Sequence, residues 1–200
     1  MPSPETELLL VRHGQSEWNA DGRWQGQSDP PLTAFGERQA ADAVARVGAV
    51  DALWASDLRR AAHTAEIIAA RLGVDVEVDQ RFRERHAGEW QGLTRPEIEA
   101  AWPGYLRDGR RPPGWEPEDA LVHRAFEGCL AVVEALPGGR VLVVTHGGVV
   151  RALERSLGSA DDSLVPNLGG RRFVADGDGL RLGPRVELLD EAEVTRPEQI

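Results

Sequence analysis

Two short apolar runs, each ending in a histidine, constrain the fold of this chain most strongly. The first run covers residues 8–11 and leads through Arg12 to His13, and the second covers residues 141–145 and leads to His146. Uninterrupted apolar runs of this length are typical of strands buried on both faces of a parallel sheet. Such sheets bind ligands at the carboxyl ends of their strands, so we expect both histidines at one anion-binding edge.

The remaining sequence alternates predicted helices with predicted strands, which indicates an α/β fold. We expect a three-layer α/β/α sandwich with a mostly parallel central sheet. A length of 200 residues suits a single domain over residues 1–200, with a catalytic core at about 8–190. Residues 93–118 are rich in Pro and Gly and are predicted to form a lid or a substrate-binding segment. Residues 190–200 are predicted to be a loose tail.

Capping residues and apolar periodicity predict the individual elements. Residues 14–32 are predicted to be a loop. A helix is predicted at 34–47 with Thr33 as N-cap, and a second follows Ser56 as N-cap and ends at Leu72. Three further helices are predicted from Thr94 to Ala101, at 118–136, and from Gly147 onward. Strands are predicted at 52–55, at 74–78, up to Thr145, at 171–175 and 180–182 as a hairpin around residues 176–179, and at 186–189.

Composition and charge exclude several classes of function. The formal net charge of −10 argues against binding to nucleic acid or to an anionic membrane. One cysteine, Cys129, leaves no intramolecular disulfide, and no apolar stretch reaches the length of a transmembrane helix. The start of the chain lacks the apolar stretch of a signal peptide. We therefore expect a cytoplasmic protein without nucleic-acid or membrane partners, and leave a homodimer open.

Five segments carry reactive side chains in a fixed order along the chain. They are residues 10–19, 26–33, 56–65, 82–92 and 145–148. In this order they resemble the signature blocks of the histidine phosphatase superfamily, also called the phosphoglycerate mutase-like family. The resemblance covers roughly residues 8–155. A single Arg-His-Gly triplet is a weak signal, whereas five ordered blocks are a specific one.

The resemblance implies phosphoryl transfer and assigns a role to five residues. His13 is the expected nucleophile and becomes a phosphohistidine, for which its attacking ring nitrogen must be free of a proton. Arg12 and Arg60 are expected to bind the phosphoryl oxygens in bidentate fashion. His146 is a third contact, either as a cation or as an N–H donor. Glu84 is the expected acid, which protonates the leaving group and then activates water.

Four further residues are predicted to bind the substrate or its phosphate: Asn19, Gln25, Gly26 and Gly147. Gly147 would open a helix, whose first backbone N–H groups and dipole favour an anion. The histidines are scattered and show no spacing typical of metal ligands. We therefore predict no metal and no cofactor, with arginine guanidinium groups neutralising the phosphate.

Two of these assignments have rivals nearby in the sequence. Arg59 competes with Arg60, and the spacing Ser-x-Leu-x-Arg-Ala favours Arg60. Glu89 and Asp79 compete with Glu84, and the resemblance favours the carboxylate directly after Arg83.

The aromatic residues around the acid leave further alternatives open. Trp90 is predicted to be a core residue and not a ligand contact. Trp102, Tyr105 and Trp115 form either a lid or the packing beneath one. His86 lies two residues from Glu84, and the sequence does not decide whether it lines the pocket.

The resemblance favours a phosphomonoester hydrolase acting on a small phosphorylated metabolite, of the phosphoglycerate type or a sugar phosphate. A phosphoglycerate mutase is the alternative, because that family also contains mutases. A mutase needs extra cations for a second phosphate, yet the 61 residues between Glu84 and His146 contain no lysine and cluster only Arg107, Arg110 and Arg111. A catalytically silent member that binds a phosphorylated ligand is the third reading.

Overall fold

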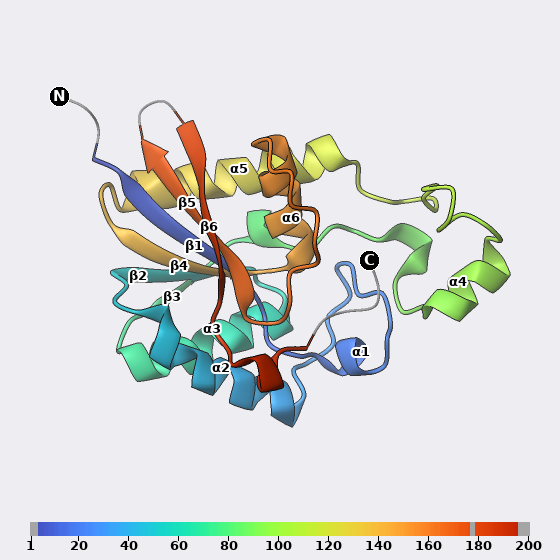
Figure 1. Cartoon of the computed structure of the whole chain (residues 1–200), viewed down its shortest axis with the longest axis horizontal. Helices are drawn as coiled ribbons and strands as arrows, with labels where there is room; N and C mark the ends of the chain where they lie inside the picture. The colour runs from blue at the N-terminus through green and yellow to red at the C-terminus, as the bar shows by residue number, and fades with distance from the viewer. Residues whose placement is uncertain (1–3, 177–178, 196–200) are drawn as a thin grey trace.

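The chain folds into a six-stranded sheet with helices on both faces (Figure 1). The structure is a computed structural model, and it describes residues 4–176 and 179–195. In their order across the sheet the strands are β3 (Val76–Val78), β2 (Ala52–Ala55), β4 (Arg140–Thr145), β1 (Thr6–Arg12), β5 (Gly169–Asp176) and β6 (Gly179–Glu187). The helices are α1 (Glu17–Ala20), α2 (Ala34–Val47), α3 (Arg59–Leu72), α4 (Arg95–Ala101), α5 (Glu118–Ala135) and α6 (Gly147–Ser156), with 3-10 turns at Gln80–Phe82, Gly88–Trp90 and Glu191–Glu193.

The predicted fold class is confirmed. Strands β3, β2, β4 and β1 run parallel, and β5 and β6 are added antiparallel beside β1. Helices α5 and α6 cover one face of the sheet, and α2 and α3 cover the other (Figure 1). None of the helices in the described residues is both long and apolar enough to cross a membrane.

The uninterrupted apolar runs arise because β1 and β4 contribute to both hydrophobic cores. Successive side chains of a strand point to opposite faces of the sheet. Leu8 and Leu10 accordingly pack with the core under α5 and α6, whereas Leu9 and Val11 pack with the core under α2 and α3. β4 behaves in the same way, so neither strand has a polar face.

The two strands also end side by side. β1 and β4 are paired so that Arg12 lies opposite Thr145, and the His13 backbone N–H donates to the Thr145 carbonyl at 3.0 Å. His13 and His146 therefore leave the same edge of the sheet together, as the sequence predicted.

Several predicted helix boundaries are confirmed. Thr33 caps α2, since its side chain accepts a hydrogen bond from the Gly36 N–H, and Gly48 follows the last residue of that helix. Thr94 caps α4 in a reciprocal arrangement with Glu97. The predicted cap of α3 is wrong, because Leu58 occupies the N-cap position without a side-chain hydrogen bond.

Other elements differ from the prediction where contacts between distant segments determine their bounds. Residues 14–32 include the short helix α1, capped by Ser16. β3 begins at Val76 and not at residue 74, because its pairing with β2 starts there. Residues 186–189 are not a separate strand, since β6 continues from the hairpin through Glu187. Residues 177–178 of the predicted hairpin turn lie outside the described residues.

The predicted loose tail is held in place as far as it is described. Glu191–Glu193 forms a 3-10 turn. The Gln39 side chain donates to the Glu193 carbonyl at 2.7 Å and to the Thr195 hydroxyl at 2.9 Å. The Asn167 N–H donates to the Thr195 carbonyl at 3.1 Å. Residues 196–200 lie outside the described residues.

Segment 93–118 carries α4 away from the sheet and builds a small core of its own (Figure 1). Trp24, Trp90 and Trp115 pack edge to face, with ring centroids 5.2–5.9 Å apart. Aromatic rings prefer this arrangement. Trp102 and Tyr105 pack against the same cluster. Trp90 is fully buried, as predicted.

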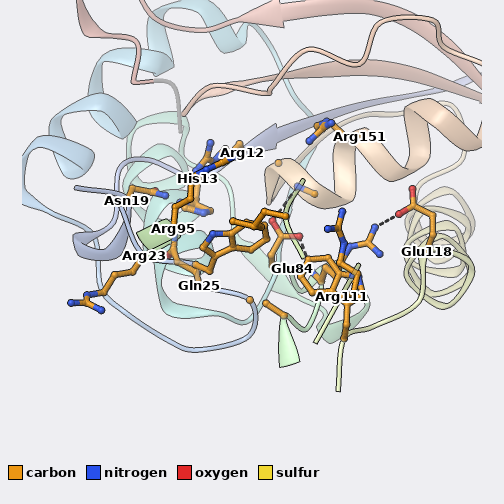
Figure 2. Close-up of a pocket in the computed structure, with 18 of the residues that line it drawn as sticks. Arg12, His13, Asn19, Arg23, Gln25, Glu84, Arg95, Arg111, Glu118 and Arg151 are labelled. Carbon is orange, nitrogen blue, oxygen red and sulfur yellow. Dashed lines mark hydrogen bonds and ion pairs between the residues drawn. The ribbon is translucent and has the colours of Figure 1, made fainter. Parts of the chain in front are cut away.

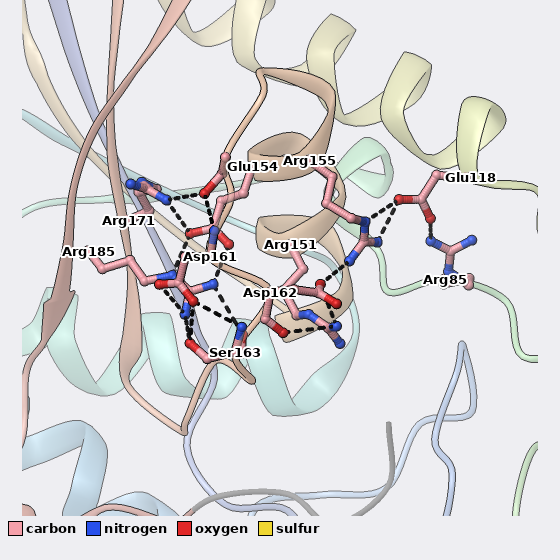
Figure 3. A network of polar contacts seen from close by, with 11 residues as sticks. Arg85, Glu118, Arg151, Glu154, Arg155, Asp161, Asp162, Ser163, Arg171 and Arg185 are labelled. Atoms are coloured by element: carbon pink, nitrogen blue, oxygen red, sulfur yellow. Dashed lines mark hydrogen bonds and ion pairs between the residues drawn. The ribbon is translucent and has the colours of Figure 1, made fainter. Parts of the chain in front are cut away.

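Glu154 on α6 is a buried carboxylate that joins this helix to the antiparallel strands (Figure 3). Arg185 of β6 donates to both of its oxygens, at 2.8 and 2.6 Å, and Arg171 of β5 donates at 3.1 Å. Arg185 also donates to the Ser163 carbonyl at 3.1 Å. The loop after α6 is thereby fixed, and its Val165 carbonyl reaches Arg12 of the site described next.

Candidate active site

His13 is held in one orientation at the end of β1. Its Nδ1 lies 2.6 Å from the Gly14 carbonyl, and its Nε2 accepts a hydrogen bond from Arg60 Nε at 3.1 Å. A carbonyl only accepts, so Nδ1 carries the proton and Nε2 keeps its lone pair. Burial, followed by the charges of Arg60 and Arg12, lowers the pKa of His13 well below 6.5. His13 is therefore neutral, with its nucleophilic nitrogen beside a guanidinium.

Arg12 and Arg60 are buried cations without a bound carboxylate among the described residues. Arg60 donates to the carbonyls of Ser28 and Gly26 at 2.7 and 2.8 Å. Arg12 donates to the Val165 carbonyl at 3.0 Å. Burial lowers the pKa of each guanidinium to about 10, and the negative charge of Glu84 opposes this shift. Carbonyls orient both groups but cannot neutralise them, which favours an anionic ligand.

Arg59 and Arg60 differ in burial, which is consistent with the preference for Arg60 over Arg59. Arg59 is exposed, whereas the Arg60 side chain is fully buried. Thr64 helps to fix this turn of α3, because its hydroxyl donates to the Arg60 carbonyl at 2.7 Å and accepts from the Gly14 N–H at 3.1 Å.

The Glu84 side chain contacts the start of α6 directly. Its Oε2 accepts from the Gly148 N–H at 3.1 Å, and its Oε1 accepts from the Arg85 N–H at 2.7 Å. A Cβ at position 148 would lie 2.2 Å from Glu84 Oε1, so a glycine is required there for this approach. Arg124 fixes the backbone of the acid from below, donating to the Glu84 carbonyl at 3.0 Å.

His146 is the N-cap residue of α6 and is fully buried. Its ring meets the His13 ring edge to face, with centroids 5.1 Å apart, and its Nε2 lies 2.9 Å from the Ser56 hydroxyl. Burial, then the positive charge of Arg60, lowers the pKa of His146 well below 6.5. His146 is therefore neutral in this structure.

One cavity of about 720 Å³ gathers the predicted site residues. Its lining includes all of them except His146, which lies buried behind it: Arg12, His13, Asn19, Gln25, Gly26, Arg60, Glu84 and Gly147. In the view of Figure 2, Arg12, His13 and Asn19 stand at one side, Arg151 and Glu118 at the other, and Glu84 between them. His86 does not line the cavity, and its Nδ1 lies 2.9 Å from the Gly114 carbonyl.

The outer half of the cavity contains arginines that sequence reasoning missed. Six arginines line it beyond Arg12 and Arg60: Arg23, Arg85, Arg95, Arg111, Arg151 and Arg155. A signal was available for two of them, because residues 147, 151 and 155 recur at four-residue spacing and share one face of the predicted helix. Of the predicted cluster, Arg111 lines the cavity, whereas Arg107 and Arg110 pair with Asp108 outside it.

Three of these outer arginines, Arg85, Arg151 and Arg155, form ion pairs with two carboxylates of the protein (Figure 3). Glu118 pairs with Arg85 and with Arg155, the latter at 2.5 Å, and Asp162 pairs with Arg155 at 3.2 Å and with Arg151 at 2.8 Å. We call these five residues the charge ladder. It connects α5, α6 and the loop after α6 along one wall of the cavity.

Arg111 differs from the ladder. Its guanidinium lies over the Trp115 ring at 4.9 Å from the centroid, and its Nη1 donates to the Arg110 carbonyl at 3.3 Å. It forms no ion pair with a carboxylate in the part of the chain that the structure describes. Desolvation and the neighbouring charge of Arg85 lower its pKa. Trp115 thus packs within the aromatic cluster of segment 93–118 and also lies beneath a cation at the cavity.

Within the described residues no three His, Cys, Asp or Glu side chains are grouped so that they could hold a metal ion. The positive charge of the cavity comes from guanidinium groups.

The chain belongs to the histidine phosphatase superfamily (branch 1), whose family model matches residues 8–171. It is 39% identical over 166 residues to phosphoglycerate mutase-like protein 4 of Arabidopsis thaliana, covering 77% of this chain and 72% of that protein. It is 39% identical over 163 residues to a metal-independent phosphoserine phosphatase of the same plant, covering 76% and 68%. A mycobacterial glucosyl-3-phosphoglycerate phosphatase complexed with VO3 matches with a TM-score of 0.79 and 31% identity, covering 92% of this chain and 99% of that one.

The neutral, buried state of His13 and His146 predicts how stability depends on pH. Both folded-state pKa values lie below 6.5, so the unfolded chain binds more protons as the pH falls through that value. Stability is fully present above pH 6.5 and is lost below it. The free energy of unfolding is expected to fall by roughly 1.4 kcal/mol per histidine between pH 7.5 and pH 5.5.

Urea unfolding at the two pH values measures this loss. The control is the His13→Gln/His146→Gln double variant, which should lose roughly 3 kcal/mol less than the natural chain over the same interval. Equal losses in the two proteins would mean that the histidines are protonated in the folded state.

Proposed function

We propose that this protein is a phosphomonoester hydrolase that acts on a small phosphorylated metabolite through a phosphohistidine at His13. The observation that carries the proposal is the unprotonated Nε2 of His13, held by Arg60 in a cavity that Glu84 also lines. Membership of the histidine phosphatase superfamily and the phosphatases among the relatives support it.

In the proposed first step, His13 Nε2 attacks the phosphorus and the bond to the ester oxygen breaks. Arg12 and Arg60 bind the phosphoryl oxygens and stabilise the charge that they carry in the transition state. Gly147 at the start of α6 offers a backbone N–H and the positive end of the helix dipole. Asn19, Gln25 and Gly26 complete the phosphate and substrate contacts. Protonated Glu84 gives its proton to the leaving oxygen.

In the proposed second step, Glu84 is ionised and takes a proton from water. The water oxygen attacks the phosphorus, the bond to His13 Nε2 breaks, and inorganic phosphate leaves. The backbone N–H groups of Arg85 and Gly148 hold the two oxygens of Glu84 in place, and their hydrogen bonds favour the ionised form that this step requires. The reaction is metal-independent in this proposal, since guanidinium groups supply the positive charge, and no cofactor takes part.

A mutase is the less favoured alternative. It must hold a substrate with two phosphates until the second hydroxyl is phosphorylated. In the charge ladder Arg85, Arg151 and Arg155 pair with two carboxylates, so only one net positive charge of the ladder remains for a second dianion. We therefore favour transfer to water. Arg111 is left to bind one further negative group, such as the carboxylate of a phosphoglycerate-type substrate.

The rest of the proposal concerns the setting of the reaction. Residues 93–118 form a lid or substrate-binding segment of a single domain, because this segment contributes Arg111 and Trp115 to the cavity. A cytoplasmic location suits a phosphatase of small metabolites. The absence of nucleic-acid and membrane partners stays a prediction, and a homodimer stays open.

Replacement of the nucleophile tests the proposed function. His13→Ala should abolish hydrolysis of p-nitrophenyl phosphate while the thermal unfolding transition is retained, because the lost imidazole is the group that attacks. The natural chain should keep full activity in EDTA. Near-normal turnover by the variant would remove His13 from the mechanism, and an inactive natural chain that still binds phosphate esters would favour the silent, ligand-binding reading.

Glu84→Gln should separate good leaving groups from poor ones. The variant keeps the shape of the side chain but has no proton to transfer, and loss of general acid catalysis typically costs on the order of 10²–10⁴ in rate. In single-turnover measurements of the phosphorylation step, the loss should be large for an alkyl phosphate and small for p-nitrophenyl phosphate, whose phenolate leaves unaided. Equal losses would assign Glu84 to orientation of the phosphate.

Arg111→Gln should weaken binding of a substrate that carries a carboxylate. A lost hydrogen bond to a charged group costs about 1.5–3 kcal/mol, so KM for 3-phosphoglycerate should rise by roughly tenfold or more. The kcat/KM for p-nitrophenyl phosphate should stay within about twofold. Arg107→Gln is the control, because that side chain is 81% exposed and lies outside the cavity. A comparable loss on both substrates would contradict a carboxylate site.

A further inference from the structure

Ser56 is a buried residue that the sequence analysis wrongly predicted to be the N-cap of α3. It follows the last residue of β2, and its hydroxyl does not cap α3. Its Oγ lies 2.9 Å from His146 Nε2, and the Ser56 side chain is fully buried. The hydroxyl therefore belongs to the surroundings of the second histidine.

The hydrogen bonds around Ser56 determine where its proton points. The Leu58 backbone N–H donates to Ser56 Oγ at 3.3 Å, so one lone pair of the hydroxyl oxygen is occupied. The hydroxyl proton still needs an acceptor, because an unsatisfied buried donor costs about 1–3 kcal/mol. Among the described residues, His146 Nε2 is the atom with a free lone pair within hydrogen-bond distance.

We infer that the Ser56 hydroxyl donates to His146 Nε2 and thereby holds His146 as the neutral tautomer with its proton on Nδ1. The inference rests on the proposed function and decides between the two roles that the sequence left open for His146. In this tautomer His146 contributes an N–H donor to the phosphoryl group, and not a cation. Ser56 is a positioning residue, since it acts through the imidazole ring.

The environment of Nδ1 supports this tautomer. Nδ1 is buried and has no hydrogen-bond partner in the described part of the chain. The His146 ring meets the His13 ring edge to face with centroids 5.1 Å apart, so the free donor belongs to a ring that contacts the proposed nucleophile. A phosphoryl oxygen would satisfy it. In the opposite tautomer a lone pair would face that oxygen, and the Ser56 proton would lose its acceptor.

The tautomer is measured directly by two-bond ¹H–¹⁵N correlation spectra of protein labelled with ¹⁵N-histidine. The His146 signals are identified by their loss in His146→Gln. The natural chain should show a protonated Nδ1 and an unprotonated Nε2. A protonated Nε2 in the natural chain, alone or together with a protonated Nδ1, overturns the inference.

Variants at position 56 test whether Ser56 sets the tautomer. Ser56→Ala should move the His146 pattern toward Nε2 protonation and lower kcat for p-nitrophenyl phosphate about tenfold, the equivalent of one hydrogen bond. Ser56→Thr keeps a hydroxyl and should keep the natural pattern. Ser156→Ala, which removes a hydroxyl on α6 that bonds the Leu153 carbonyl, is the control and should change neither.

The outcomes separate this inference from the proposed function. An unchanged His146 pattern in Ser56→Ala overturns the role of Ser56 whatever the activity. Absence of turnover by the natural chain on all phosphomonoesters contradicts the proposed function, while a natural chain with a protonated Nδ1 that is lost in Ser56→Ala still supports the tautomer assignment.

Discussion

The enclosure of a neutral histidine between two buried guanidinium groups is the constraint on which the rest of this site depends. Arg12 and Arg60 lie within the fold of a protein whose formal net charge is −10, yet their hydrogen bonds are to backbone carbonyls and to the neutral His13 ring, and not to carboxylates. Buried charges are costly unless they are paired. Their positive charge opposes protonation of His13, and the same charge attracts a phosphate. In the proposed mechanism one arrangement therefore prepares both the nucleophile and its substrate site.

Several distant segments cooperate to hold this arrangement. The loop after α6 supplies the Val165 carbonyl, and the buried Glu154 fixes that loop through Arg185. Arg124 of α5 holds the backbone of the acid segment at Glu84. Much of the polar network outside the cavity thus fixes the backbone that presents the reactive groups, which matches the precision that positioning and electrostatic catalysis require.

The parts of the fold that the sequence predicted are those governed by local chemistry or by burial on both faces. The runs that became β1 and β4, the cap Thr33, and the glycine stops Gly48 and Gly73 depend on residues close in sequence. The grouping of Arg12, His13, Arg60 and His146 was predictable because these residues lie at strand ends and helix starts on one edge of the sheet.

The remaining features depend on contacts between segments far apart in the chain. Ser56 looked like a helix cap, but a histidine 90 residues away competes for its hydroxyl. The charge ladder connects Arg85 and Glu118 to residues in α6 and in the loop that follows it. Sequence spacing alone could place only Arg151 and Arg155 on the same helix face. The described part of the tail is ordered by Gln39 of α2, which no local pattern reveals.

The most direct test of this account is to determine which ring nitrogen of His13 carries phosphate. Enzyme mixed with substrate and quenched in alkali should contain a phosphohistidine, and ³¹P–¹⁵N correlation on ¹⁵N-histidine-labelled protein identifies the bonded nitrogen. The geometry predicts phosphate on Nε2, because Nδ1 carries the proton that is donated to the Gly14 carbonyl. Phosphate on Nδ1, on another residue, or nowhere during turnover would contradict the account.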